Sequence, residues 1–181
     1  MKRSKKAALV LMVPATTFLL AGCSEEPEQA MVFSAPSECY EGGFSSPEAC
    51  IADFKAAQAM HPQVAPKYLS KAECEADFGP GQCETAPQQT TSGGSVFMPM
   101  MMGYMMGSML SRTQAGGSVP TQPLYKSRDD RSTFRTASNQ PLAKNSGLVS
   151  VKPSQMKPQV GQLVQRGGFG QQAAMRASYG G

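Results

Sequence analysis

Five cysteines are the side chains best suited to covalent chemistry in this chain of 181 residues, and the first of them, Cys23, lies close to the N-terminus. A basic stretch at residues 2–6 precedes an apolar stretch at residues 7–20 and the sequence Leu20-Ala-Gly-Cys23. A basic start, a short apolar core and small residues at the exit are typical of a secretory signal peptide. In a bacterial lipobox of this form, the cysteine thiol receives a diacylglycerol before cleavage. The sequence therefore predicts a signal peptide at residues 1–22 and a lipid anchor on Cys23.

The anchor on Cys23 and the residue after it predict where in the cell the protein lies. A permanent membrane-spanning helix needs roughly 20 apolar residues, more than residues 7–20 provide. Two or three acyl chains, palmitate among them, give stable attachment, since each buried methylene contributes about 0.8 kcal/mol. Ser24 stands where an aspartate would resemble the inner-membrane retention signal. We expect a cell-envelope lipoprotein on the outer membrane, facing the periplasm; an ordinary signal peptide with a chance cysteine, or a buried helix, is the alternative.

The remaining four cysteines, Cys39, Cys50, Cys74 and Cys83, predict two disulfides, because an even number in an oxidising compartment usually pairs. Of the three possible pairings, the short loops favour Cys39–Cys50 with Cys74–Cys83. An internal echo leaves open that Cys50 and Cys74 are equivalent positions bonded to different partners. A redox site would usually show Cys-x-x-Cys, and a zinc site needs more than the single His61.

The echo around two of these cysteines predicts a pair of short helices. Residues 46–54 (SPEACIADF) and 70–78 (SKAECEADF) share the frame S-x-x-x-C-x-A-D-F. Each copy begins with a serine that can cap a helix, followed by an early glutamate and good helix formers. The predicted helices span about 47–60 and 70–78, and His-Pro and Gly-Pro-Gly sequences end them.

A methionine-rich stretch follows, with seven of the thirteen methionines between Met98 and Met109. As a helix at residues 96–110, it would place four methionines on one stripe, namely Met98, Met102, Met105 and Met109. Thioethers are soft ligands that suit Cu(I), so a periplasmic Cu(I) site using this cluster, with Met100, Met101 and Met106, is one hypothesis. Any buried or membrane-dipping helix would show the same spacing.

The same stretch carries no charge between residues 93 and 111. An apolar patch of this kind, if exposed, usually contacts a partner. Gly103 and Gly107 form a G-x-x-x-G pair that permits close helix contact. We therefore expect Met98–Leu110 to pack, to self-associate, or to contact an unknown envelope protein or the membrane surface.

Charge divides the mature chain into an acidic and a basic part. From Ser24 to Glu84, eleven acidic side chains accompany three basic ones; from Thr85 onward, ten basic side chains accompany two acidic ones. Such asymmetry suggests different partners for the two parts, or mutual attraction between them. The basic part could bind anionic surfaces such as lipid headgroups or lipopolysaccharide phosphates; solvated linker charge is the alternative.

Low sequence complexity predicts disorder for much of the second half. Residues 111–181 are rich in Gly, Ser, Gln and Pro and bury too little apolar surface to offset the ordering entropy of about 1–2 kcal/mol per residue. We expect only a brief strand around residues 147–151 or a turn at Gly167-Gly168.

Catalysis and nucleic-acid binding find little support in the residue types. One histidine cannot supply a triad alone, the acidic residues form no obvious paired site, and no phosphate-cradling glycine loop follows a strand. The basic part lacks the dense charge runs and interleaved aromatics of a nucleic-acid binder. We therefore predict no enzyme, no cofactor and no nucleic-acid partner.

Several strings resemble the YgiB family of uncharacterised exported lipoproteins from Gram-negative bacteria. After the lipobox, the matching strings, in the family's order, are Ala65-Pro-Lys-Tyr68 leading to Cys74, Phe78-Gly-Pro-Gly-Gln-Cys83, Met98-Pro-Met to Gly103-Tyr-Met-Met-Gly107, Gln122-Pro-Leu124 and Arg166-Gly-Gly-Phe-Gly170. The resemblance implies an envelope lipoprotein of unknown biochemical function, with no catalytic residues to carry over. Members of the family are often encoded beside an enzyme similar to ATP-grasp peptide–amine ligases.

Together these patterns predict a mainly disordered, low-complexity chain with a small α-helical, disulfide-stapled domain and one Met/Gly-rich helix. The predicted parts are a signal peptide (1–22), an acidic tether (23–36), a Cys-rich helical domain (37–84), a linker (85–95), a Met/Gly-rich apolar helix (96–110) and a disordered basic tail (111–181). The predicted function is that of a membrane-anchored, non-enzymatic interaction or structural protein, with Cu(I) binding as the alternative.

Overall fold

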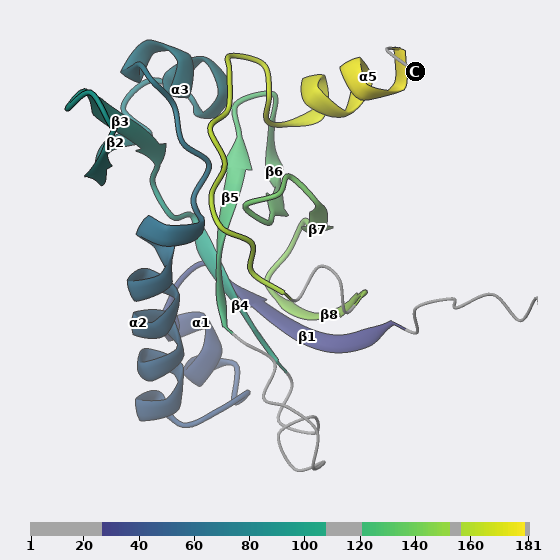
Figure 1. Cartoon of the computed structure of the whole chain (residues 1–181). Helices are drawn as coiled ribbons and strands as arrows, with labels where there is room; N and C mark the ends of the chain where they lie inside the picture. The colour runs from purple at the N-terminus through teal and green to yellow at the C-terminus, as the bar shows by residue number, and fades with distance from the viewer. Residues whose placement is uncertain (1–26, 108–120, 153–156, 180–181) are drawn as a thin grey trace, which may run out of the picture.

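A curved antiparallel sheet forms the centre of the molecule, with strands in the spatial order β7-β6-β5-β4-β1-β8 (Figure 1). The computed structural model describes residues 27–107, 121–152 and 157–179 of the chain. The strands of this sheet are β1 (Glu28–Phe33), β4 (Gly103–Gly107), β5 (Gln122–Ser127), β6 (Asp130–Arg135), β7 (Pro141–Ala143) and β8 (Gly147–Val151). A separate antiparallel hairpin consists of β2 (Cys83–Gln89) and β3 (Ser95–Pro99). The expectation of a mainly disordered chain with a small helical domain is therefore wrong.

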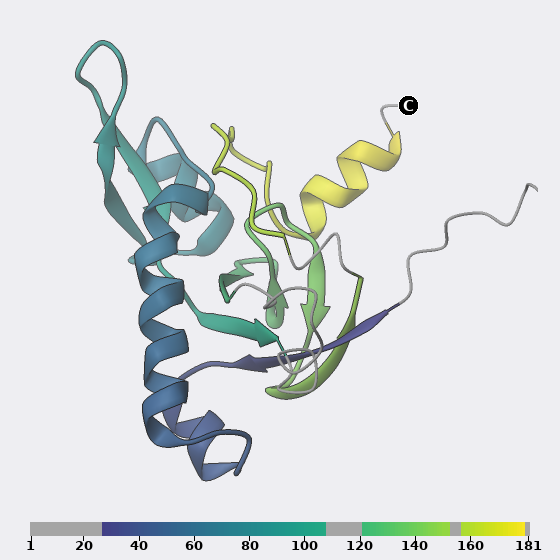
Figure 2. The same ribbon diagram turned by 60° about the horizontal axis from the view of Figure 1, so that its bottom comes forward.

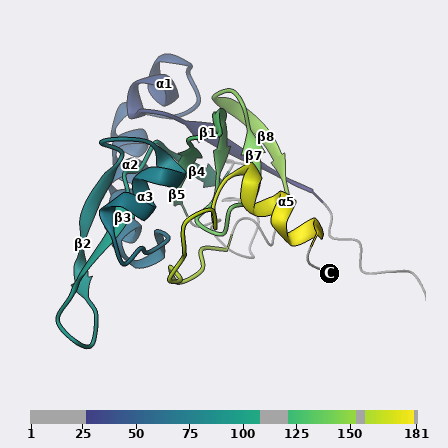
Figure 3. The same ribbon diagram turned by 90° about the horizontal axis from the view of Figure 1, so that it is seen from above.

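The helices lie around this sheet. They are α1 (Pro36–Glu41), α2 (Pro47–Val64), α3 (Lys71–Phe78) and α5 (Gln171–Tyr179). Figure 2 shows α2 running alongside the sheet, with the β2–β3 hairpin near its C-terminal end. Figure 3 shows α5 on the side of the molecule away from α2. The helices predicted at 37–84 thus belong to the same packed unit as the sheet, because Cys39, Cys50 and Ala57 pack against strand residues.

The methionine-rich stretch is apolar throughout because part of it forms the strand β4, which is buried on both faces. Side chains alternate across a strand, and in β4 Tyr104 and Met106 pack towards α1 and α2, whereas Met105 packs on the opposite face with Leu124. A strand buried on both faces reads as a continuous apolar run, and periodicity alone does not distinguish such a run from a buried helix. The predicted Met/Gly-rich helix at 96–110 is therefore wrong: its described residues, 96–107, contribute to β3 and β4.

Glycine in β4 permits a close approach between strands. A Cβ atom on Gly103 would lie 2.7 Å from the carbonyl oxygen of Phe33 in β1 and 2.7 Å from a ring carbon of Phe134 in β6. Real Cβ atoms essentially never make contacts this short, and Phe33 presents backbone there. Gly103, one of the two glycines that predict a helix–helix contact, thus allows close sheet packing instead.

The two predicted echo helices exist and start where the sequence indicated. The hydroxyl of Ser46 accepts a hydrogen bond from the amide of Ala49, and that of Ser70 accepts one from the amide of Glu73, each at 3.2 Å. These bonds satisfy amides that have no partner within the helix. The helix α2 runs beyond its predicted end to Val64 and contains Pro62, whose missing N–H removes one helix hydrogen bond.

Segments expected to lack structure form strands. Residues 28–33 of the expected tether (23–36) form β1, and β2 and β3 take up the ends of the expected linker (85–95). The expected disordered tail (111–181) contains β5 to β8 and α5 among its described residues. The brief strand predicted at residues 147–151 is confirmed as β8, which pairs with β1.

Several buried polar groups of the second half have partners within the protein, whereas Ser127 Oγ and Arg135 Nε have none among the described residues. Arg135 is only 4% exposed, and its guanidinium lies 3.3 Å from the carboxylate of Asp130 and donates to the backbone oxygen of Asn139. A buried charge is tolerated when it is paired and hydrogen-bonded. Hydrogen bonds, led by that from Ser132, lower the pKa of Asp130, so its carboxylate stays available to Arg135.

Candidate functional site

A buried aspartate joins α3 to the C-terminal segment. Asp77 lies in the last turn of α3 and is 1% exposed. One carboxylate oxygen accepts from the amide of Gly167 at 2.7 Å and from the side-chain amide of Gln172 at 3.3 Å. The other accepts from the hydroxyl of Tyr68 at 3.0 Å and from the amide of Phe169 at 3.2 Å. We call this arrangement the Asp77 junction.

The Asp77 junction fixes the loop Arg166-Gly-Gly-Phe-Gly170 against α3. Phe169 of this loop is 1% exposed and packs on Phe78 of α3, with ring centroids 4.6 Å apart, and on Tyr125 of β5. Aromatic pairs at such distances contribute about 0.5–1.5 kcal/mol beyond area burial. The loop is therefore held by both hydrogen bonds and aromatic packing.

Tyr68 serves the junction as a donor. Burial, together with the neighbouring charge of Asp77, raises its pKa, so the phenol keeps its proton across the physiological range. The hydroxyl therefore donates to Asp77 and does not act as a base.

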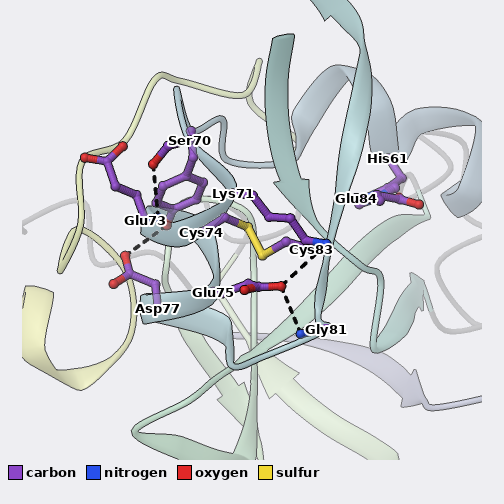
Figure 4. Close-up of a disulfide and its surroundings, with 11 residues drawn as sticks. His61, Ser70, Lys71, Glu73, Cys74, Glu75, Asp77, Gly81, Cys83 and Glu84 are labelled. Carbon is purple, nitrogen blue, oxygen red and sulfur yellow. Dashed lines mark hydrogen bonds and ion pairs between the residues drawn. A yellow bond between two sulfur atoms is a disulfide. The ribbon is translucent and has the colours of Figure 1, made fainter.

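A second polar cluster surrounds the single histidine of the chain. His61, in the last turn of α2, is 7% exposed. Its Nδ1 lies 2.9 Å from the hydroxyl of Tyr125, and its Nε2 lies 3.1 Å from a carboxylate oxygen of Glu84 (side chains of His61 and Glu84 in Figure 4). A neutral ring protonated at Nε2 fits both contacts, since Nδ1 then accepts from Tyr125 and Nε2 donates to Glu84. Burial lowers the pKa of His61 although Glu84 opposes this effect.

Lys67 lies beside this cluster. Its ammonium donates to the backbone oxygen of Pro62 and approaches the sulfur of Met98 at 3.8 Å. Burial lowers the pKa of Lys67. Because its ammonium binds the carbonyl of Pro62 near the end of α2, Lys67 satisfies an acceptor that the helix leaves open.

The four domain cysteines form Cys39–Cys50 and Cys74–Cys83, the pairing that the short loops favoured. The first disulfide connects α1 to α2, and the second connects α3 to β2. In Figure 4, Glu75 lies near Cys74–Cys83 and accepts from the backbone amide of Gly81 at 3.0 Å. Both disulfides are buried, which suits structural bridges. Cys23, the predicted lipidation residue, lies outside the described residues.

The structure does not bring the four methionines of the predicted stripe together. Met98 is buried with Tyr68 and Phe78, whereas Met105 is buried in a different cluster within the sheet. Met102 is 39% exposed between β3 and β4, and Met109 lies outside the described residues. The helix that would align these methionines in one copper-binding stripe is not formed by the described residues 96–107, which contribute to β3 and β4.

Sequence reasoning missed the polar residues that organise the fold, Asp77, His61 and Tyr125. The echo and the string at 166–170 are both unusual in the sequence, so each could have been marked as a candidate structural feature. Nothing local indicated that these two strings bind each other across ninety residues.

The described part of the chain contains neither a membrane-spanning helix nor a cluster of His, Cys, Asp and Glu side chains suited to a metal ion. In residues 27–107, 121–152 and 157–179, no helix is both long and apolar enough to span a membrane. The same residues contain no group of three or more His, Cys, Asp or Glu side chains that could hold a metal ion.

Comparison with known proteins identifies the family to which this sequence belongs. Residues 27–180 match the family described as a protein of unknown function, DUF1190. The chain belongs to this family. The resemblance to the YgiB family is thereby confirmed.

Curated relatives extend over nearly the whole chain. A UPF0441 protein of Sodalis glossinidius (strain morsitans) is 32% identical over 194 residues, which cover 97% of this chain and 88% of the relative. A UPF0441 protein of Serratia proteamaculans (strain 568) is 32% identical over 97% of this chain and 86% of its own length. One of Erwinia tasmaniensis is 32% identical over 91% of this chain and 80% of its own length. No solved structure matches the chain significantly.

Proposed function

We propose that this chain is a lipid-anchored protein of the bacterial cell envelope that acts by binding and not by catalysis. The observation that carries the proposal is Leu20-Ala-Gly-Cys23 behind a basic and then apolar N-terminus. Acyl chains on Cys23 would hold the sheet domain close to a membrane, since β1 begins at Glu28, five residues further on. A chain of five residues spans at most about 18 Å.

The disulfides support export. Cys39–Cys50 and Cys74–Cys83 each close a short loop inside one chain. Stable structural disulfides form mainly in oxidising compartments such as the periplasm. A periplasmic location therefore agrees with the signal peptide.

A binding role is supported by how the acid–base side chains are engaged. Asp77 uses both carboxylate oxygens for hydrogen bonds within the protein. His61 uses both ring nitrogens, with Tyr125 and Glu84. Catalysis needs such groups within reach of a substrate, whereas here they connect helices, strands and the C-terminal loop.

The membrane partner of this proposal is the lipid bilayer, through Cys23. Within Met98–Leu110, the described residues Met98, Tyr104, Met105 and Met106 are buried in the core of the domain itself, so this proposal does not rest on them as a docking surface. The outer membrane is the proposed destination, since Ser24 replaces the aspartate of a retention signal.

Lipid labelling tests the proposal. Cells expressing the wild-type protein or a Cys23→Ser variant are grown with labelled palmitate, and the protein is purified, weighed by intact-mass spectrometry and fractionated with the membranes. We expect label, an acylated Cys23 at the N-terminus and membrane fractionation for the wild type, and none of these for Cys23→Ser. A wild-type protein that retains Met1, or carries an unmodified thiol at Cys23, would refute the anchor.

A further inference from the structure

Three arginines from separate segments line one pocket of about 530 Å³. Arg128 lies in the turn between β5 and β6, Arg166 begins the loop before α5, and Arg176 lies in α5. All three side chains are exposed. Arg166 and Arg176 lie close together in the sequence, whereas Arg128 lies far before them, so only the tertiary fold brings Arg128 beside the other two.

The two carboxylates in the pocket are already bound to donors of the protein. Asp77 receives the four hydrogen bonds of the Asp77 junction. Asp129 accepts from the backbone amide of Gln172 in the first turn of α5 at 2.9 Å. Within the described ranges, neither Arg128 nor Arg166 forms an ion pair with a carboxylate. These donors are neutral and leave both carboxylates charged, so the lining carries three guanidiniums against two carboxylates, a formal net charge of +1.

Arg176 is held in place by the loop. Its Nη1 donates to the backbone oxygen of Arg166 at 3.3 Å. Gly167 has a φ of +77°, and a Cβ atom there would lie 2.5 Å from the same Nη1. Glycine thus allows both the left-handed backbone and the close approach of the guanidinium. The loop shapes one wall of the pocket and orients a charge in it.

We propose that Arg128, Arg166 and Arg176 form a binding site for a phosphate group. A guanidinium presents several N–H donors in a planar fork that matches phosphate oxygens, and charge-assisted bonds of this kind are about twice as strong as neutral ones. Guanidiniums from three segments suit the several oxygens of a phosphate better than the two of a carboxylate. The pocket volume of about 530 Å³ leaves room for a phosphate group.

Two sources share this chemistry, a lipid headgroup and a soluble phosphorylated compound. A lipid headgroup as the ligand depends on the proposed anchor at Cys23, which precedes β1. The helix α5 and the start of β1 both lie on the side of the molecule away from α2 (Figures 1 and 3). The phosphate site itself stands without the anchor, because it rests on side chains within the described fold.

Titration tests the site. The full chain, purified in its lipidated form in a neutral detergent, is titrated with inorganic phosphate, pyrophosphate and glycerol phosphate by calorimetry at low salt. In parallel, its binding to vesicles of phosphatidylglycerol is compared with binding to vesicles of phosphatidylcholine, using Cys23→Ser protein so that acyl chains do not insert. We expect saturable binding in at least one arm, and a loss of affinity of about tenfold or more in Arg128→Gln and in Arg166→Gln.

Arg131→Gln is the matched control, because Arg131 is also exposed but lines a different pocket, with Lys126. We expect this variant to bind as tightly as the wild type. Arg128→Lys and Arg166→Lys keep the charge but lose the planar fork, and we expect intermediate affinity. Urea unfolding confirms that each variant is folded.

The two arms identify the source. Binding of soluble phosphates without a preference for phosphatidylglycerol assigns a soluble ligand, and a preference for these vesicles without soluble binding assigns a headgroup. Either result supports the site when the pocket variants abolish it. Equal binding by wild type, Arg128→Gln and Arg166→Gln, or no saturable binding in any arm at millimolar ligand, would overturn the proposal, whatever the outcome of the palmitate experiment.

Discussion

Replacing Asp77 by asparagine should loosen the C-terminal loop and lower the free energy of unfolding. The change keeps the size of the side chain but leaves one oxygen where the carboxylate has two. The carboxylate accepts from the backbone amides of Gly167 and Phe169 on different oxygens. Whichever way the new amide faces, one of these two buried N–H groups meets another donor.

The expected decrease in the free energy of unfolding follows from the hydrogen bond that is lost. Hydrogen bonds to charged groups contribute about 1.5–3 kcal/mol, and a buried donor left without an acceptor costs about 1–3 kcal/mol. We therefore expect Asp77→Asn to lower the free energy of unfolding by about 2–3 kcal/mol, and Asp77→Ala by more, since alanine removes the acceptor for all four donors.

The internal echo supplies the matched control. Asp53 occupies the corresponding position in the first copy, and its carboxylate accepts from the hydroxyl of Thr121 at 3.0 Å. Because Asp53 is only partly buried, we expect Asp53→Asn to cost less than about 1 kcal/mol.

Two measurements decide the outcome. Urea unfolding with intact disulfides gives the free energies, and native-state hydrogen exchange follows the amides of Gly167 and Phe169. We expect faster exchange at one or both amides in Asp77→Asn, and no change in Asp53→Asn. Equal free energies for the two variants, or unchanged exchange in the loop, would show that the Asp77 junction does not hold the C-terminal segment.

Three further predictions concern pH, the disulfides and sorting. Because burial lowers the pKa of His61, the unfolded chain binds more protons than the folded one near this pKa. The free energy of unfolding should therefore fall as the pH decreases from about 6.5, by at most about 1.4 kcal/mol per pH unit for one group. Urea unfolding from pH 7.5 to 5 should show a smaller slope in His61→Gln than in the wild type, and an identical slope would contradict this role of His61. Removing Cys39–Cys50 by a double exchange to alanine should lower the free energy of unfolding by about 2–4 kcal/mol, measured without reductant, and an unchanged urea midpoint would count against a structural bridge. Ser24→Asp should move the protein to the inner-membrane fraction of a sucrose gradient, with Ser24→Ala remaining in the outer membrane; if both variants sediment alike, the sorting argument fails.

The sequence by itself determined those features that depend on neighbouring residues. Serine caps begin α2 and α3 at Ser46 and Ser70, because a cap bond reaches only three residues along the chain. The short loops between cysteines favoured the pairing that the structure contains. The family strings, and the strand at 147–151, were also recognisable from local sequence alone.

Only the tertiary structure decided the role of the methionine-rich stretch. Tyr104 and Met106 face one side of β4 and Met105 faces the other, and each side meets a different apolar cluster. An apolar run of this length fits a strand or a helix equally well, because its pattern shows no exposed face. The neighbouring strands β1 and β5 supply the backbone partners that make it a strand.

The disorder predicted for the polar second half is wrong for a related reason. Its composition predicts disorder when apolar burial within the segment is counted alone. In the structure, β5 pairs with β4 and β8 with β1, Arg135 is paired with Asp130, and Phe169 joins the core beside Phe78. These contacts connect residues far apart in the chain, so local sequence could not reveal them, and they offset the entropy of ordering a polar segment.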